Sequence, residues 1–296
     1  MSKAKPRITI IGLGLIGGSV GLALREADVA SEVIGHDREP GKSALAKKKG
    51  AVDKTHWNLV SAVEEADLVI LATPLGAIEE TLTSIGPELR SGCVVMDTAN
   101  LKVPVLAWAA EALPQEVFFV GGNPVVSQAV EGQGGLDAAR ADLFQNGIFC
   151  LTPSPTADPA AVKLTADLVT ILGAKPLFLD AAEHDGLVGA SEFLPMLLAS
   201  TLLETVTGQP SWREIRKMAG ASFETGTQLA STAPAGLGEV CLANRDNLLR
   251  WIDGFSASLA VSPWAKATFL VRTSKGAITR TANRFSGGRI KLAPRP

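Results

Sequence analysis

The chain has 296 residues, a formal net charge of −2, a hydrophobic fraction of 46% and a mean hydropathy of +0.22. This length allows one large or two ordinary domains, and the near-zero charge argues against a nucleic-acid partner. Three scattered cysteines argue against disulfides and against a metal site. The longest apolar run, Phe193 to Leu203, is interrupted and too short to span a bilayer, and the amino-terminus does not fit a signal peptide. We therefore expect a cytoplasmic enzyme that binds neither membranes nor nucleic acids.

A glycine fingerprint follows the first predicted strand. The β-branched run Ile8 to Ile11 leads into Gly-x-Gly-x-x-Gly, and Val20 to Ala27 reads as a helix. The first glycine permits a tight turn, the second lets the backbone approach a pyrophosphate, and the third lets helix and strand pack closely. The free N–H groups at the helix start favour the pyrophosphate's negative charge. The residues expected to hold a dinucleotide here are Gly12, Gly14, Leu15, Ile16 and Gly17.

The end of the second predicted strand favours a particular cofactor. Asp37 lies 20 residues beyond Gly17, where a carboxylate accepts hydrogen bonds from the adenosine ribose. Asp37 would repel the 2′-phosphate of NADP, whereas Arg38 beside it could accommodate that phosphate. We therefore expect NAD as the cofactor and keep NADP as the alternative.

The remaining pattern predicts an α/β fold followed by helices. Strands alternating with helices imply right-handed crossovers and a mainly parallel sheet. The predicted strands span residues 7–11, 32–36, 67–72, 93–97, 117–121, 147–151 and 175–179, with a helix at 158–172 before the last. Strand signals end at Ala181, and helices are predicted over 182–207, 211–231, 236–258 and 262–284. We expect an N-terminal Rossmann domain over 1–180 and an all-helical domain over 181–296 that buries its apolar surface in a homodimer.

Two strand ends carry further candidate site residues. Thr73 and Pro74 follow the strand 67–72 and are expected to line the cofactor, although a simple strand-ending turn is the alternative. Lys102 follows the strand 93–97 after Asp97-Thr98-Ala99-Asn100-Leu101. It could hold a substrate carboxylate or steady an oxyanion, or it could be an exposed lysine at a helix start.

Several motifs occur in an order that resembles a known family. They are Ile16-Gly17-Gly18-Ser19, Asp97-x-x-Asn100-x-Lys102, Gly121-Gly122-Asn123-Pro124, Asp142-Leu143-Phe144, Leu151-Thr152-Pro153, Glu183-His184-Asp185 and Leu194-Pro195. This order resembles the prephenate and arogenate dehydrogenases over nearly the whole chain. The resemblance implies an NAD-dependent oxidative decarboxylation in tyrosine biosynthesis, in which a small cyclohexadienyl acid loses a hydride and carbon dioxide and becomes aromatic. It also implies a catalytic histidine, a serine and a lysine beside it, and histidine and arginine groups that hold the substrate.

This chain departs from the family pattern at nearly every substrate-facing position. The family's catalytic histidine is Asn123 here, and an amide cannot take a proton near neutral pH. The serine of Ser-x-Lys is Asn100, and the arginine near the substrate carboxylate is Gln228, which gives up a charge-assisted contact. Both histidines of Ser-His-Leu-Pro-His are absent from Glu192-Phe193-Leu194-Pro195-Met196. The expected substrate-binding residues are Asn100, Ser127, Glu192, Met196 and Gln228.

The remaining candidates for proton transfer are few. His184 is the best placed of the three histidines, although it could instead pair with Asp185 as a helix-start cap. A desolvated Glu192 beside Phe193 is the other candidate base. We expect Asn123 to orient the ring hydroxyl, Lys102 to support it or a carboxylate, and His184 or Glu192 to relay protons. Two alternatives stay open: a dehydrogenase of this fold for a different small acid, and a non-catalytic NAD-binding protein.

Overall fold

The computed structural model describes residues 5–126, 134–154, 156–231 and 236–261. The chain divides into two compact units, Met1–Leu248 and Leu249–Pro296. The first unit continues through several helices beyond residue 180. The predicted domain boundary near residue 180 stays a prediction.

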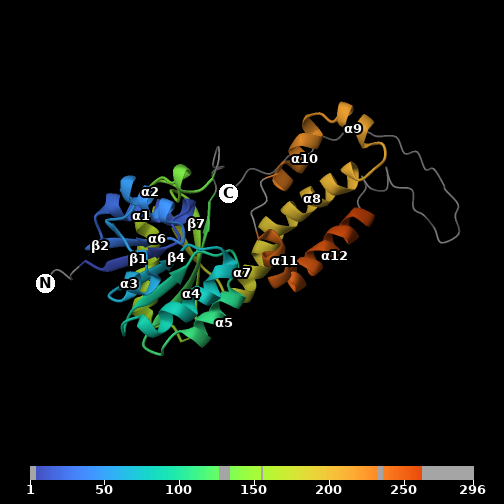
Figure 1. Cartoon of the computed structure of the whole chain (residues 1–296). Helices are drawn as coiled ribbons and strands as arrows, with labels where there is room; N and C mark the ends of the chain where they lie inside the picture. The colour runs from blue at the N-terminus through green and yellow to red at the C-terminus, as the bar shows by residue number, and fades with distance from the viewer. Residues whose placement is uncertain (1–4, 127–133, 155, 232–235, 262–296) are drawn as a thin grey trace. The chain divides into compact units, whose positions relative to one another are not determined.

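An eight-stranded sheet forms the centre of the first unit (Figure 1). The strand order is β3-β2-β1-β4-β5-β6-β7-β8, and every neighbouring pair is parallel except β6 and β7. The predicted mainly parallel sheet is therefore confirmed, with a short β3 that the sequence pattern did not predict. The strands are β1 (Arg7–Ile11), β2 (Glu32–His36), β3 (Lys54–Thr55), β4 (Leu68–Leu71), β5 (Val94–Asp97), β6 (Phe118–Val125), β7 (Ile148–Pro153) and β8 (Lys175–Phe178).

Helices cover both faces of the sheet, as right-handed crossovers between parallel strands require. One face carries α1 (Leu15–Ala27), α2 (Pro40–Lys48) and α6 (Pro159–Ile171), and the other carries α3 (Leu59–Val63), α4 (Ile78–Ile85) and α5 (Val103–Ala112) (Figure 1). Each face therefore encloses its own apolar core.

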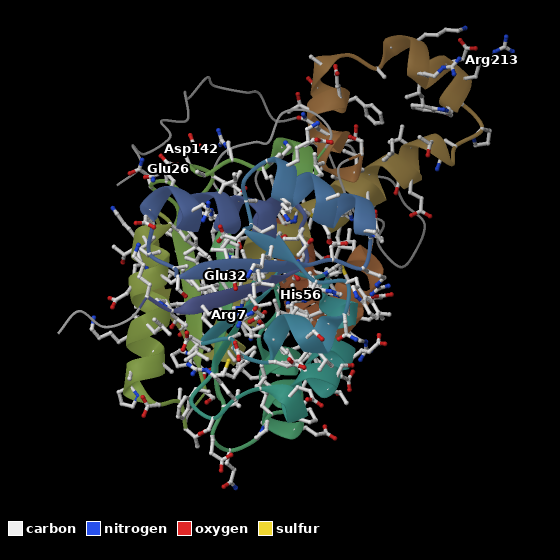
Figure 2. The ribbon with its side chains drawn as sticks, turned by 60° about the vertical axis from the view of Figure 1, so that its left-hand side comes forward. Arg7, Glu26, Glu32, His56, Asp142 and Arg213 are labelled. Carbon is white, nitrogen blue, oxygen red and sulfur yellow. The ribbon has the colours of Figure 1, made fainter. Side chains whose placement is uncertain are left out.

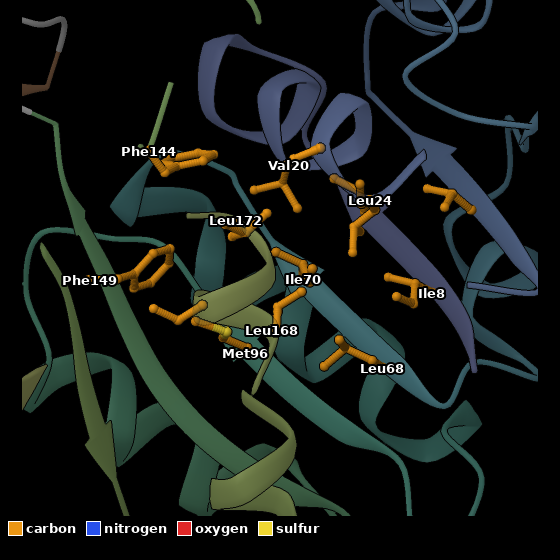
Figure 3. Packing of buried hydrophobic residues seen from close by; sticks show 14 of the residues in the cluster. Ile8, Val20, Leu24, Leu68, Ile70, Met96, Phe144, Phe149, Leu168 and Leu172 are labelled. Carbon is orange, nitrogen blue, oxygen red and sulfur yellow. The ribbon is translucent and has the colours of Figure 1, made fainter. Parts of the chain in front are cut away.

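The core on the α1 and α6 face is made by alternate residues of the central strands. Ile8, Leu68 and Ile70 pack with Leu24 of α1 and Leu168 of α6, as Figure 3 shows. All five side chains are at most 4% exposed. Strands that are buried on both faces read as continuous apolar runs, which is why these strands were predictable from composition alone.

Charged side chains sit where the first strands begin. Arg7 of β1 lies 3.4 Å from Glu32 of β2 between Nε and Oε2 (Figure 2). At the other end of β2, the Nδ1 atom of His36 lies 3.0 Å from the backbone carbonyl of His56. These contacts tie the edge of the sheet together at both ends of β2.

The later part of the chain is helical, with more breaks than the sequence pattern indicates. The predicted helix 211–231 is two helices separated at Ala219 and Gly220, and 236–258 is two helices separated at Asn244. The predicted helix 262–284 lies outside the described residues. The observed helices are α7 (Ala181–Val188), α8 (Leu194–Thr207), α9 (Trp212–Met218), α10 (Ala221–Ser231), α11 (Leu237–Ala243) and α12 (Arg245–Val261).

The stretch Ala181–Thr207 is continuously helical, because a π-helical turn over Gly189–Phe193 joins α7 to α8. Its 27 residues have a mean hydropathy of 1.5 in their most apolar window, so length and composition alone would let it cross a membrane. This differs from the expectation that the apolar run is too short, because neither Glu192 nor Pro195 ends the helix. Only 28% of that window is buried inside the chain, and most of the other residues of the stretch are partly buried.

Candidate functional site

A pocket opens where β1, β2 and β4 end, at the point where the strand order reverses. In open α/β sheets, ligands bind in the crevice outside the carboxyl ends of the strands at this point. Backbone hydrogen bonds hold the strand ends together: Gly12 N donates to His36 O at 2.8 Å, and Ala72 N donates to Ile11 O at 2.7 Å.

The three glycines of the fingerprint meet different requirements. Gly12 has a φ of +92°, and a Cβ there would lie 2.4 Å from the Ala72 carbonyl oxygen. A Cβ on Gly17 would lie 1.9 Å from the Gly12 carbonyl oxygen. A Cβ on Gly14 would meet no protein atom within 4 Å, because it would project into open space at the pocket. Gly12 and Gly17 are therefore required by the fold, whereas Gly14 leaves room for a ligand.

The pocket fits a dinucleotide at three further points. No side chain caps the start of α1, so its first N–H groups stay available to a pyrophosphate. Asp37 lies at the end of β2 and accepts hydrogen bonds from Leu13 N and Glu39 N, both at 2.8 Å, which hold its carboxylate in place at the pocket. The Thr73 hydroxyl, also in the lining, is buried without a hydrogen-bond partner in the described structure.

All of the predicted cofactor residues except Gly17 lie in the pocket lining, namely Gly12, Gly14, Leu15, Ile16, Asp37, Arg38, Thr73 and Pro74. The lining also includes residues of α11 and the turn before it, which the sequence pattern did not single out: Gly236, Leu237, Glu239 and Val240. Glu239 comes close to Gly76, where a Cβ would lie 2.9 Å from the Glu239 carboxylate. No sequence signal near Glu239 predicts this approach, since it depends on how α11 packs.

Lys102 is fully buried rather than exposed at a helix start. Its ammonium contacts the Asp97 carboxylate and donates to the Gly122 carbonyl at 2.6 Å. Asp97 also accepts hydrogen bonds from Gly122 N and Ala99 N, both at 2.9 Å. Burial lowers the pKa of Lys102, while the adjacent Asp97 carboxylate opposes that shift. The Lys102 ammonium is therefore held by two protein groups, the Asp97 carboxylate and the Gly122 carbonyl, at the end of β5.

A hydrogen-bonded chain runs from Asp185 to Asn123. Lys102 N and Val103 N donate to the two carboxylate oxygens of Asp185 at 2.7 and 2.9 Å. The His184 Nδ1 atom lies 2.9 Å from Asp185 Oδ1, and His184 Nε2 lies 3.1 Å from the Asn123 amide nitrogen. Because the carboxylate only accepts, Nδ1 carries the proton and Nε2 accepts from the Asn123 amide. Asn123 Oδ1 is then left to accept a hydrogen bond from another group.

Glu192 belongs to the same region through Asn100. Asn100 lies near the Glu192 carboxylate and also lines the nucleotide pocket. Burial raises the pKa of Glu192, and the nearby Asn100 amide and His184 partly oppose this shift. Asn100, Asn123, His184 and Glu192 are called the polar cluster below.

The other predicted substrate residues lie apart from the pocket lining. Met196 is half-buried on α8, and Gln228 is exposed on α10. Ser127 lies outside the described residues. Their predicted roles in substrate binding stay predictions.

Comparison with known proteins gives a consistent result. The protein-family model "Prephenate dehydrogenase, nucleotide-binding domain" matches residues 20–177. A second family model, "Prephenate dehydrogenase, dimerization domain", matches residues 180–264. A prephenate dehydrogenase of Bacillus subtilis is 31% identical over 258 residues, covering 86% of this chain and 68% of that protein. A cyclohexadienyl dehydrogenase of Zymomonas mobilis is 29% identical over 254 residues, covering 85% of each.

The solved structures agree with these sequence relatives on the fold. A prephenate dehydrogenase from A. aeolicus, in complex with hydroxyphenyl propionate and NAD+, superposes with a TM-score of 0.80 at 24% identity, over 88% of this chain and 90% of that one. The predicted family resemblance and the predicted fold class, a Rossmann-type domain followed by a helical domain, are confirmed. The expectation of an NAD-dependent dehydrogenase is confirmed with them.

The different spaces around Gly14 and Gly17 lead to different effects of adding a methyl group. We expect Gly14→Ala to unfold in urea like the wild type without NAD, but to bind NAD at least about tenfold more weakly, because the new Cβ fills the approach to the pyrophosphate. Gly17→Ala is the matched variant, and overpacking should reduce its stability by about 1–3 kcal/mol or more. Urea unfolding and calorimetric NAD titration test this, and equal effects of both variants on stability would contradict it.

The burial of Lys102 predicts a large structural cost for its removal. We expect Lys102→Met to lower the free energy of unfolding by about 3–5 kcal/mol, because it leaves the Asp97 carboxylate buried and uncompensated. Lys163→Met is the control, because Lys163 pairs with Asp167 at 2.8 Å on the surface and should change stability by less than about 1 kcal/mol. Urea unfolding compares the two variants, and a small loss in Lys102→Met would show that the pair does not stabilise the fold.

Proposed function

Because the chain belongs to the prephenate dehydrogenase family, we propose that it catalyses the NAD-dependent oxidative decarboxylation of prephenate, arogenate or a closely related cyclohexadienyl acid. The observation that carries this proposal is the loop after β5: Asn100 lines the nucleotide pocket, and Lys102, two residues later, hydrogen-bonds Asp185 and the Gly122 carbonyl, the neighbours of His184 and Asn123. A substrate held at the cluster would therefore lie beside the bound cofactor. When bound, NAD supplies the hydride acceptor.

Different residues of the chain would hold the dinucleotide and the substrate. Gly14, the start of α1 and Asp37 would hold the dinucleotide at its pyrophosphate and ribose. Asn123 would accept a hydrogen bond from the ring hydroxyl through Oδ1, because His184 occupies its amide nitrogen. Orienting the hydroxyl in this way positions the ring carbon for hydride loss.

A second candidate substrate carries an amino group where prephenate carries its ring hydroxyl. The Glu192 carboxylate and the Asn123 amide oxygen are both hydrogen-bond acceptors, and an ammonium group supplies three donors and a positive charge. This candidate keeps the same cofactor and the same oxidative decarboxylation.

We further propose that the enzyme is a homodimer through its helical region and works in the cytoplasm. Leu202 of α8 and Leu229 of α10 are 42% and 40% exposed within this chain, and only 28% of the most apolar window of Ala181–Thr207 is buried. A second copy could bury these side chains. The three cysteines are free thiols, which suits a reducing compartment.

Turnover tests the proposed reaction directly. We expect NADH absorbance to rise when the enzyme is mixed with NAD and prephenate, arogenate or the 4-amino analogue of prephenate, with the highest kcat/KM identifying the substrate. NADP should be used less well, because the Asp37 carboxylate repels its 2′-phosphate. An enzyme that binds NAD but oxidises none of the three acids would contradict the proposal.

Light scattering coupled to gel filtration tests the dimer. We expect a dimer mass for the wild type and a monomer mass for Leu202→Glu/Leu229→Glu, because charged side chains cannot be buried unpaired in an apolar interface. Leu177→Glu is the control: Leu177 is equally exposed at 42% but lies on β8, and this variant should remain a dimer. A monomeric wild type would overturn the assignment.

A further inference from the structure

One wall of the nucleotide pocket comes from the helical part of the chain. Gly236, Leu237, Glu239 and Val240, from α11 and the turn before it, complete the lining that the strand ends begin. Of these four residues only Glu239 carries a charge. We propose that Glu239 is a cofactor-binding residue, whose carboxylate accepts a hydrogen bond from the ribose attached to the nicotinamide. This inference rests on the NAD cofactor and not on the identity of the acid substrate.

Buried contacts fix the place of α11 against the strand ends. Val240 is 9% exposed and belongs to the same apolar cluster as Leu75 and Ala99, which also line the pocket. The residue that follows α11, Asn244, is buried, and its side-chain amide donates to the Asp185 carbonyl at 2.8 Å. The helix is therefore a fixed part of the pocket, and a side chain on it has a defined position relative to the strands.

The Glu239 carboxylate lies over the turn that follows β4, η1 (Leu75–Ala77). A Cβ added to Gly76 in this turn would lie 2.9 Å from Glu239 Oε2. A glutamate at the third position of a helix can cap its own helix start, but a Cβ on Gly236, the N-cap of α11, would lie 3.9 Å from the same oxygen. In the described parts of the chain, Glu239 is exposed and its carboxylate has no hydrogen-bond or ion-pair partner. It is therefore free to accept a hydrogen bond from a ligand.

The charge of Glu239 restricts which part of the dinucleotide can lie beside it. The phosphates are anionic and would be repelled, and the start of α1 is available to hold them. A ribose hydroxyl is a neutral donor, and its hydrogen bond to a carboxylate is strengthened by the charge. Asp37 is placed to accept from the adenosine ribose. The ribose of the nicotinamide half is therefore the one left for Glu239.

The order of the strands supports this division of the two riboses. The pocket lining extends from Asp37, after β2, to Thr98, after β5. A dinucleotide with its adenosine ribose at Asp37 crosses the point where the strand order reverses, so its other half lies over β4 and β5. Gly76 follows β4, which is two strands away from β2 in the sheet. Glu239 therefore lies on the side where the second ribose is expected.

Two ligands that differ by this ribose test the assignment. ADP carries the adenosine half alone, whereas ADP-ribose adds the second ribose without the nicotinamide ring. In calorimetric titrations of the full chain, we expect Glu239→Ala to bind ADP-ribose and NAD about tenfold more weakly, because a hydrogen bond to a charged group is lost. Its affinity for ADP should be unchanged.

Glu79→Ala is the matched control for the loss of a negative charge. Glu79 is an exposed acid in the first turn of α4, three residues beyond Gly76 and outside the pocket lining. This variant should bind all three ligands like the wild type. Unchanged NAD affinity in Glu239→Ala would overturn the proposal, and so would an equal loss of affinity for ADP and ADP-ribose, which would assign Glu239 to the adenosine half.

Gly76→Ala tests the placement of the carboxylate independently. The new methyl group meets only the end of a flexible side chain, so its urea unfolding midpoint should match that of the wild type. We expect Gly76→Ala to displace the carboxylate and weaken ADP-ribose binding, with no further loss in Glu239→Ala/Gly76→Ala. Additive losses in the double variant would overturn the placement on which the proposal depends.

These measurements also separate the inference from the proposed function, because none of them requires turnover. A wild type that binds NAD but oxidises no cyclohexadienyl acid would overturn the proposed function and leave the role of Glu239 to be decided by the ADP-ribose titrations alone. A wild type that binds none of the three nucleotides would overturn both.

Discussion

The buried contact between Asp97 and Lys102 is the interaction on which the rest of the site depends. The Asp97 carboxylate accepts from the Gly122 and Ala99 backbones, and the Lys102 ammonium donates to the Gly122 carbonyl. The pair therefore joins the end of β5 to β6 next to Asn123. The backbone N–H of the same lysine donates to Asp185, which connects this junction to α7 and to His184. Removing a charged pair from water costs free energy, and the hydrogen bonds from the Gly122 and Ala99 backbones to Asp97 and from Lys102 to the Gly122 carbonyl help to offset that cost.

This arrangement gives several residues a different role from the one that the family motifs imply for their positions. Lys102 agrees with the family motif but has only protein partners, while Asn123 of β6 occupies a histidine's place and is held by His184 of α7. The residues expected to bind the nucleotide therefore match the family pattern more closely than those expected to contact the substrate. Gly12 and Gly17 leave no room for a side chain, so their replacement would damage the fold as well as the site. Substrate-facing side chains carry no such backbone requirement, and selection for a different substrate can act on them.

Much of the fold was predictable because it follows from residue types and backbone angles within short segments of the chain. The central strands are continuous apolar runs ending in glycine or a polar turn, and the buried β1 and β4 require just such residues on both faces. The fingerprint predicted the turn into α1 because positive φ and close contact permit only glycine at Gly12. The breaks at Gly220 and Asn244 were missed, since helical periodicity continues through them. The Asn244 amide instead donates to the Asp185 carbonyl at 2.8 Å, a contact with a residue 59 positions away in the chain.

The sequence by itself determined the family, the nucleotide-binding turn and the loss of the family's histidine and arginine, because these follow from residue types at fixed spacings. Only the tertiary structure decided what the remaining polar residues do. Lys102 and His184 are buried among protein partners, while Glu192 stays partly exposed. The physical reason is that burial and hydrogen-bond partners come from residues on different strands and helices, and these set which side chain can exchange a proton with a ligand.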